Sequence, residues 1–410
     1  MIVTGVISVL GLNLVGLAFT GMEHSLHVLL TLLGLYGLVR FKEDGQVRAW
    51  WILSVVVAPF VRFEGMSTVL LVTSFLLGQR RIVPAITCLG LVGAGMAVWW
   101  IVMSRLELPF LPSSVAMKLD LQASTGGISS FLLMRLARNI ESNLNSRAGL
   151  ILFAIAAALL LRATPKQFIR CLQSTGPQFV GPAVALFGAG LIVAHLAVGK
   201  EGWFVRYEAY VLIGGVVCLI AAFYRAIPGG RRRWQWAILA GCALAVLQPY
   251  TLATLRTPTA AAHVFAQQYQ MHRLAADILR VPVGVNDLGW VSFRNDNYVL
   301  DFWGLGSEVA RKARMAAVAS GRAKDGVWMN DIARGRRVQV AMIYEAYLPA
   351  PADWIKVAEL QLNMRIITPA HGVVSIFVLD PELLGPVIDS LRVLEVTLPS
   401  EASLRILAVP

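Results

Sequence analysis

Ionisable and aromatic side chains gather in four short motifs of this 410-residue sequence. The motifs are GMEHS at 21–25, RFEG at 62–65, LPFLPSSVAMK at 108–118 and GWFVRYEAY at 202–210. A carboxylate beside a cation can take a proton from a hydroxyl group, and a guanidinium group pairs with anions. These residue types indicate a site that handles protons or anions. Their function depends on where the chain places them.

A second group of polar residues follows two apolar stretches further along the chain. Asn286 and Asp287 end the first stretch, and Asp301 lies in YVLDFWGLG. Acidic residues and glycines in this pattern are typical of strand ends in α/β domains, where loops carry function. The motif alone does not indicate which function.

The composition is that of a membrane protein. Hydrophobic residues make up 57% of the sequence and charged residues 15%, and the mean hydropathy is +0.66. These values are far from the balance of a soluble domain. Long apolar runs occupy 1–254, whereas 255–410 have an ordinary mixed composition. We therefore expect a transmembrane region over 1–254 and a soluble α/β domain over 255–410.

The first region predicts a polytopic α-helical protein with about nine spans, since a span needs roughly 20 apolar residues. The apolar runs lie at about 2–20, 25–40, 49–61, 65–79, 83–103, 148–162, 177–198, 208–225 and 235–254. With this topology the loops RFKEDGQVR, GQRR, LRATPKQFIR and YRAIPGGRRRW fall on one side, with twelve Lys or Arg against two acids. The positive-inside rule then predicts a cytoplasmic N-terminus and an extracytoplasmic C-terminal domain.

Most of the net charge of +12 comes from basic residues of the predicted transmembrane region. Of 36 basic and 24 acidic residues, 16 and 15 lie after position 254, which leaves 20 and 9 before it. We expect anionic membrane lipids to contact the basic loops, and the pattern argues against nucleic-acid binding. The four cysteines lie in apolar runs or an inner loop and predict neither disulfides nor a metal site. A loosely held divalent ion stays an open alternative.

All four motifs lie at outer span ends in this topology. An ionisable group there is a functional candidate if it faces the helix bundle, but it often only extends to the interface. Simpler structural roles are therefore open. Glu23 can cap a helix, and Arg62 can pair with Glu64 across a tight turn. Lys118 can be a solvated lysine, and the RYEAY aromatics can form an interfacial belt.

The motifs TGMEHSLHVLLTLLGLY, VRFEG, LPFLPSSVAMK, GWFVRYEAY and NDLGWVSFRNDNYVLDFWGLGS, in this order, resemble bacterial GT-C superfamily glycosyltransferases. The resemblance is to the arabinofuranosyltransferase-like and mannosyltransferase-like membrane proteins in particular, and it extends from about residue 18 to about 315. It implies an inverting enzyme of the bacterial inner (plasma) membrane that takes a sugar from a polyprenyl-phosphate carrier. The sugar would pass to a cell-envelope glycan, lipid or protein acceptor on the outer face.

The resemblance also implies roles for particular residues. Arg62, Lys118 and Arg206 would bind the donor phosphodiester by charge-assisted hydrogen bonds. A carboxylate near the acceptor hydroxyl would act as the general base while the sugar passes through an oxocarbenium-like state, and Glu23 and Glu64 are the candidates in this sequence. A further set would contact the sugar or the acceptor: Tyr207, Glu208, Asp287, Trp290, Asp301 and Trp303. A structural alternative is equally strong for the strand ends, where Asp287 can cap the next helix and Gly304 can permit the turn.

The sequence departs from these families at its start. In the GT-C families that the sequence resembles, the catalytic acid usually lies in the first outer loop, directly after the first span. Here the first apolar run leads straight into GMEHS, a motif that these families place later, so the usual first span and its acidic loop are missing. Three explanations are a translation start further upstream, transfer of the catalytic role to Glu23 or Glu64, and an inactive relative.

A transporter or flippase of lipid-linked saccharide is the main alternative function. It would show inverted or parallel repeats and polar residues at mid-span. The sequence shows neither clearly, because the deepest polar candidates, His195 and Gln248, lie near the ends of apolar runs.

Overall fold

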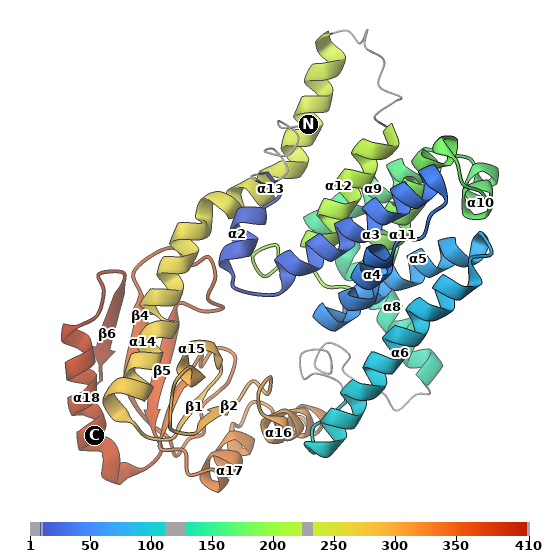
Figure 1. Ribbon diagram of the computed structural model, residues 1–410. Coiled ribbons are helices and arrows are strands. Elements are labelled where there is room, and N and C mark those ends of the chain that lie inside the picture. The colour runs from blue at the N-terminus through green and yellow to red at the C-terminus, as the bar shows by residue number, and fades with distance from the viewer. Residues whose placement is uncertain (1–8, 10, 111–127, 224–232, 408–410) are drawn as a thin grey trace. The chain divides into compact units, whose positions relative to one another are not determined.

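The computed structural model describes residue 9 and residues 11–110, 128–223 and 233–407. Within the helices at 128–135 and 233–246 it describes the backbone alone. The chain forms two compact units (Figure 1). Unit 1 extends to Leu108 and continues, after the undescribed segment, to Thr257, and most of unit 2 is formed from Pro258 onward.

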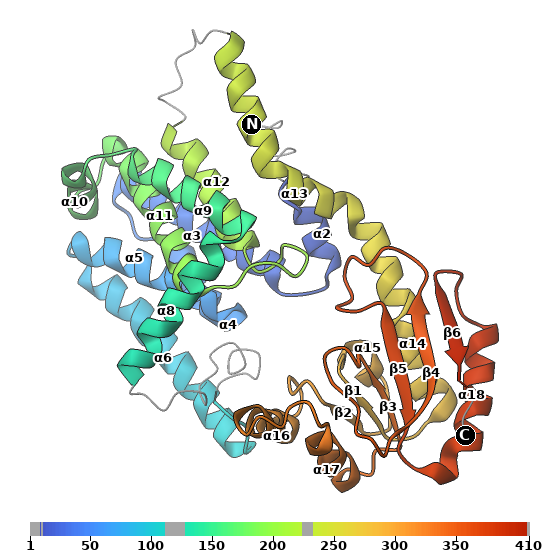
Figure 2. The same cartoon turned by 180° about the vertical axis from the view of Figure 1, so that it is seen from behind.

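Unit 1 is a bundle of helices around one apolar core (Figure 2). Residues of most of its helices contribute to that core, including Leu38, Val72 and Ile192. The helices are α2 (Leu14–Phe19), α3 (His24–Asp44), α4 (Ala49–Val61), η1 (Phe63–Gly65), α5 (Met66–Gly78), α6 (Ile82–Arg105), α8 (Ile128–Leu144), α9 (Arg147–Leu160), α10 (Pro165–Gln173), η2 (Pro177–Phe179), α11 (Val180–Val198) and α12 (Ala209–Phe223). The long helix α13 (Arg233–Ala266) begins in unit 1 and ends in unit 2.

The prediction of about nine spans is wrong. Within the described residues three helices are long and apolar enough to cross a membrane, His24–Asp44, Ile82–Arg105 and Pro177–Val198. Leu136–Leu144 and Arg147–Leu160 make a fourth only if their 98° bend belongs to one span. The structure is thus compatible with a membrane location, but it does not show the polytopic architecture.

Short helices account for the difference. The runs 49–61 and 65–79, counted as two spans, form α4 and α5, each of 13 residues. Such a helix extends only about 20 Å at 1.5 Å per residue, against a bilayer core of about 30 Å. The run 208–225 gives α12, which is described as far as Phe223, where the undescribed residues begin, and the run 2–20 gives α2 (Leu14–Phe19), although residues 1–8 and 10 lie outside the described part. Hydropathy thus located these helices, but helices of this length are too short to cross a bilayer as straight spans.

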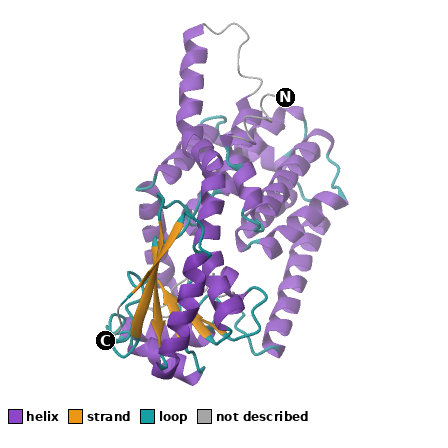
Figure 3. Ribbon diagram, turned by 90° about the vertical axis from the view of Figure 1, so that its left-hand side faces the viewer, coloured by secondary structure: helices purple, strands orange, loops and turns teal. Residues whose placement is uncertain are grey.

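Unit 2 contains a mixed sheet of six strands in the order β2-β1-β3-β5-β4-β6 (Figure 3). β1 pairs in parallel with β2 and β3, and the remaining pairs are antiparallel. β1, β2, β3 and β5 lie in the apolar stretches VPVGVN, YVLDFWG, RVQVAMIYEAY and VVSIFVLD, as expected for an α/β domain. The bounds are β1 (Val283–Val285), β2 (Val299–Asp301), β3 (Val340–Ile343), β4 (Ile355–Leu362), β5 (Val373–Val378) and β6 (Ala402–Ile406).

Helices cover both faces of this sheet. Alternate strand residues point to opposite faces, so Val340 and Met342 join one core while Ala341 and Ile343 join another. The first core packs against α14 (Gln268–His272), η4 (Arg273–Leu279) and α18 (Leu384–Val396), and the second against α16 (Glu308–Ala319) and α17 (Val327–Gly335). β2 and β3 lie on opposite sides of β1, so the chain crosses from one side of β1 to the other between β2 and β3. Open α/β sheets bind ligands beyond the carboxyl ends of strands at such a reversal of order.

Candidate functional site

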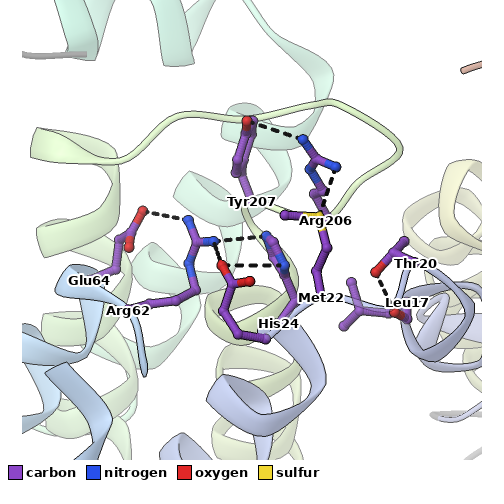
Figure 4. Close-up of polar contacts among 9 residues, drawn as sticks. Leu17, Thr20, Met22, His24, Arg62, Glu64, Arg206 and Tyr207 are labelled. Carbon is purple, nitrogen blue, oxygen red and sulfur yellow. Dashed lines mark hydrogen bonds and ion pairs between the residues drawn. The ribbon is translucent and has the colours of Figure 1, made fainter. Parts of the chain in front are cut away.

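Three of the four motifs meet at one end of unit 1 (Figure 4). One part comes from the start of α3, a second from the turn between α4 and α5, and a third from the loop before α12. We call this group the Arg62 cluster, which consists of Glu23, His24, Arg62, Glu64, Arg206 and Tyr207.

Arg62 is the centre of the cluster. Its Nη1 atom donates to Glu23 Oε1 over 2.6 Å and lies 3.0 Å from His24 Nε2. Its Nη2 atom donates to Glu64 Oε1 over 3.0 Å. The pairing of Arg62 with Glu64 across the turn is therefore present, but it is part of a larger group. Glu23 makes no side-chain cap to α3, so its carboxylate is held by Arg62 instead.

The backbone between α4 and α5 is built for a close turn. Arg62 ends α4 in an extended conformation, with φ −149° and ψ 138°. Gly65 packs directly on the preceding helix, because a Cβ atom at this position would lie 2.5 Å from the carbonyl carbon and oxygen of Ala58. Glycine at this position lets the chain turn back with Arg62 and Glu64 on the same side.

Arg206 carries the second cation of the cluster. Its Nη1 atom lies 3.1 Å from Met22 Sδ, and its guanidinium carbon lies 5.2 Å from the centre of the Tyr207 ring. Its Nη2 atom lies 3.5 Å from the Tyr207 hydroxyl, and its Nε atom is buried without a hydrogen bond. Within the described residues no carboxylate pairs with Arg206. A sulfur atom is a weak acceptor, so this guanidinium can still bind an anion.

The charges around Glu23 keep it ionised. Burial by itself would raise the pKa of Glu23, but a backbone hydrogen bond and the positive charge of Arg62 outweigh it, and the pKa lies below its ordinary value. The Glu23 side chain is 40% exposed, compared with 17% for Glu64. Glu23 is therefore the carboxylate of the cluster that a substrate can reach more easily.

The loop that carries Arg206 has an unusual backbone. Trp203, Phe204 and Val205 have consecutive positive φ angles of 49°, 62° and 63°, a left-handed turn that is uncommon for residues with side chains. Asn13 Nδ2 donates to the Phe204 carbonyl over 3.2 Å, which ties the turn to the segment before α2. Contacts from outside the loop thus fix the direction in which Arg206 leaves it.

Glu208 and Lys118 are not part of the Arg62 cluster. Glu208 is 2% exposed, and its Oε2 atom accepts a hydrogen bond from Gly202 N over 3.0 Å. Burial raises the pKa of Glu208 to about 7, with a further contribution from the charge of Glu201. Its observed contact fastens the loop that carries Arg206, and its burial is a poor match to the predicted contact with a sugar. Lys118 lies outside the described residues.

Tyr210 is a candidate that sequence reasoning missed. Its hydroxyl lies 3.2 Å from His195 Nδ1, and its ring stacks on His27 with 4.2 Å between centres. All three side chains are buried. A usable signal was present, since polar residues within apolar helices are themselves functional candidates.

In unit 2, Asp287 and Trp290 follow the carboxyl end of β1. Asp287 does not cap the next helix, α15 (Gly289–Ser292), whose cap residue is Leu288 without a side-chain bond. Its Oδ2 atom instead accepts a hydrogen bond from Gln268 Nε2 over 3.1 Å. Burial raises the pKa of Asp287 above its ordinary value. Trp290 is 41% exposed, so its ring is available for contact.

Asp301 and Trp303, after β2, have structural partners. Asp301 Oδ1 accepts from Trp303 N over 2.8 Å, and Oδ2 accepts from Gly306 N over 2.7 Å. The guanidinium carbon of Arg314 lies 3.8 Å from the centre of the Trp303 ring, so it covers one face of the indole. Gly304 has φ +88° and permits the turn, as predicted. These contacts hold the loop in place. They also occupy both oxygens of Asp301 and one face of the Trp303 ring, which reduces the part of each side chain that a sugar could contact.

The described part of the chain contains no group of three or more His, Cys, Asp or Glu side chains that could hold a metal ion. Its free cysteines, Cys88, Cys171 and Cys218, are buried. The divalent ion left open by the sequence therefore has no candidate centre among these residues.

Comparison with known proteins concerns unit 2 alone. A family model described as a domain of unknown function, DUF8728, matches residues 260–377, from the end of α13 into β5. No curated protein and no solved structure matches the chain. The comparisons thus relate part of unit 2 to a family without a known activity, and the resemblance to glycosyltransferases stays a prediction.

Proposed function

We propose that the protein transfers a sugar from a polyprenyl-phosphate-linked donor to a hydroxyl group of a cell-envelope glycan, lipid or protein. One observation carries this proposal: apolar helices hold, at one end, a partly exposed carboxylate, Glu23, and a cation without a carboxylate partner among the described residues, Arg206. The reaction requires a base for the acceptor hydroxyl and a cation for the phosphate of the donor.

Arg206 is the phosphate ligand in this proposal. A phosphodiester would replace the weak sulfur acceptor of Met22 with charged oxygen atoms, and the Tyr207 hydroxyl lies beside it. The resemblance assigned Arg62 to the phosphate as well. However, both terminal nitrogens of Arg62 already bind carboxylates, so we assign it the role of positioning Glu23 and Glu64.

The proposed transfer proceeds in one displacement. Glu23 takes the proton of the acceptor hydroxyl while the hydroxyl oxygen forms a bond to C1 of the sugar. The bond between C1 and the phosphate oxygen breaks, and its electron pair leaves with the polyprenyl phosphate. Arg206 stabilises the negative charge that develops on the leaving phosphate. Attack from the face opposite the phosphate inverts the configuration at C1.

We also infer that the protein lies in the bacterial inner membrane with the Arg62 cluster on the outer side. α3 begins at the cluster and ends beside two predicted inner loops, where Arg81 Nη2 donates to the Gly45 carbonyl over 3.3 Å and Gly176 N donates to the Lys42 carbonyl over 2.7 Å. Basic loops at one end of a candidate span support a cytoplasmic side there. The C-terminal unit would then be extracytoplasmic.

Donor binding by an arginine variant tests the proposed function. We expect Arg206→Ala to weaken binding of polyprenyl-phosphate mannose or polyprenyl-phosphate arabinofuranose at least tenfold, and Arg206→Lys to restore part of it, because a lysine loses the paired contact. Arg138→Ala, on an exposed position of α8, is the matched control and should bind like the wild type. Unchanged donor binding by Arg206→Ala would remove the phosphate ligand and, with it, the proposal.

A further inference from the structure

Arg311, in α16 of unit 2, is a buried cation without a hydrogen bond. The residue is 7% exposed, and its Nη1 atom is buried and unpaired. Its nearest carboxylate is Glu308, whose Oε1 atom lies 3.7 Å from Arg311 Nη2. The same Oε1 atom pairs more closely, over 2.9 Å, with Lys312 Nζ. Arg311 therefore makes only a long ion pair with an oxygen that is already engaged.

Such an arrangement is costly for the protein. A guanidinium group has five N–H donors, and a buried donor that loses its water partners without gaining others destabilises the folded state. An uncompensated buried charge costs several kcal/mol. An anion that binds Arg311 would remove this cost.

A second arginine lies on the same side of α16. Arg314 follows Arg311 by three positions, a spacing that brings side chains together on a helix. Its Nη1 atom donates to the Trp303 carbonyl over 3.3 Å, and its guanidinium group stacks on the Trp303 ring. Gly304 lets the loop approach closely, because a Cβ atom there would lie 2.8 Å from Arg311 Cα. α16 and the loop after β2 are therefore packed closely against each other.

The carboxylates near these arginines are engaged elsewhere. Asp301 uses both oxygens on backbone N–H groups of its own loop, and Glu308 pairs with Lys312. The group therefore contains three basic residues, Arg311, Lys312 and Arg314, and only two acidic ones. One positive charge is left over beyond the carboxyl end of β2, in the parallel part of the sheet, where α/β sheets bind ligands.

We propose that Arg311 and Arg314 form a binding site for a phosphate-class oxyanion, separate from the Arg62 cluster. Arg311 supplies a paired contact to two oxygens of the anion, and Arg314, fixed by Trp303, supplies additional positive charge. A free phosphate and the phosphate head of a prenyl lipid present the same chemical group to this site. The proposal does not depend on sugar transfer.

Thermal unfolding of the full chain in detergent, followed by tryptophan fluorescence, tests the site. Inorganic phosphate and farnesyl phosphate are added in separate titrations at constant ionic strength. We expect the wild-type Tm to rise with the anion that binds, because a ligand of the folded state stabilises it. In the Arg206→Ala background, which removes the proposed donor site, Arg311→Met should abolish the rise, and its Tm without ligand should exceed that of Arg206→Ala alone, because the unpaired charge has been replaced by an apolar chain.

Matched variants complete the test. Arg392→Met removes an exposed charge on α18, outside this group (Arg392 is 69% exposed), and should keep the full rise. Arg311→Lys should bind the anion at least tenfold more weakly than the wild type. A rise with inorganic phosphate supports a site for the free anion, and a rise with farnesyl phosphate alone supports a lipid-borne one. No rise in the wild type, an equal rise in Arg206→Ala with and without Arg311→Met, or loss of the rise in Arg206→Ala with retention in Arg311→Met would each overturn the proposal.

Discussion

Arg62 Nη1 donates to Glu23 Oε1 over 2.6 Å, joining two residues that lie 39 positions apart. The bond connects the start of α3 to the turn between α4 and α5. Because the other terminal nitrogen of Arg62 holds Glu64, a single guanidinium group fixes two carboxylates. The position of the proposed base therefore depends on Arg62.

Replacing Arg62 should cost stability. Its side chain is 10% exposed, and Arg62→Met would leave two carboxylates without their cation. We expect a loss of about 3 kcal/mol in the free energy of unfolding, the range seen when one partner of a buried ion pair is removed. Denaturant titration in detergent measures it. Arg40→Met, which breaks the exposed pair with Glu43, should cost less than about 1 kcal/mol, and equal losses in the two variants would contradict the central role of Arg62.

Gly65 should tolerate no side chain. Gly65→Ala places a methyl group 2.5 Å from the Ala58 carbonyl, and overpacking of this kind typically costs about 1–3 kcal/mol. The turn must then move, so we expect Gly65→Ala to lose donor binding as well as stability. Gly93→Ala is the control, because no atom lies within 4 Å of the added Cβ. If both variants keep wild-type stability and donor binding, the turn does not depend on this contact.

The stability of the protein should depend on pH through Glu208. Its pKa rises from 4.5 in the reference state to about 7 in the folded protein because of burial. Below pH 4.5 the carboxyl group is protonated in both states, so Glu208→Gln should have little effect there. As the pH rises towards 7, the unfolded state loses its proton first and the folded state loses relative stability. Above pH 7 the Gln variant should be more stable by on the order of 3 kcal/mol. Equal differences in Tm at pH 4.5 and pH 8 would disprove this account.

The orientation in the membrane can be measured with reporter tags. A tag after Arg81 should report the cytoplasm, because that loop belongs to the basic set that the structure brings beside Gly45. A tag at the C-terminus should report the outer compartment. An outer report from the tag after Arg81 would reverse the proposed sides and place the Arg62 cluster, at the other end of α3, away from an outer acceptor.

The sequence predicted unit 2 better than unit 1, for a physical reason. Short strands bounded by polar residues, such as VPVGVN before Asp287, have a period that is readable along the chain. In unit 1 the apolar runs located the helices, but their number was taken for the number of spans although several runs are too short to cross a bilayer. Gly65 and the extended conformation of Arg62 end α4 after 13 residues. The break falls between the apolar runs 49–61 and 65–79, so the error lay in counting such short runs as spans.

The sequence predicted which residues form the candidate site, but it did not predict the contacts that these residues make. GMEHS, RFEG and RYEAY identified the charged groups that meet in the Arg62 cluster. The sequence could not show that Arg62 is occupied by two carboxylates, or that Glu208 turns to Gly202 N. Arg311 gave no signal at all, because a helix rich in arginine normally presents them to solvent. Its burial follows from packing against the loop at Gly304.

Sugar transfer by a Glu23 variant tests the proposed function most directly. Wild type, Glu23→Gln and Glu64→Gln would be compared for binding and for transfer from polyprenyl-phosphate mannose and polyprenyl-phosphate arabinofuranose. Glutamine keeps the shape of the side chain but cannot take a proton. We predict that Glu23→Gln binds the donor within threefold of the wild type and transfers at least a hundredfold more slowly, a typical loss for a general base. Wild-type transfer by Glu23→Gln, or a wild-type protein that binds the donor and moves it across the membrane without transfer, would contradict the account.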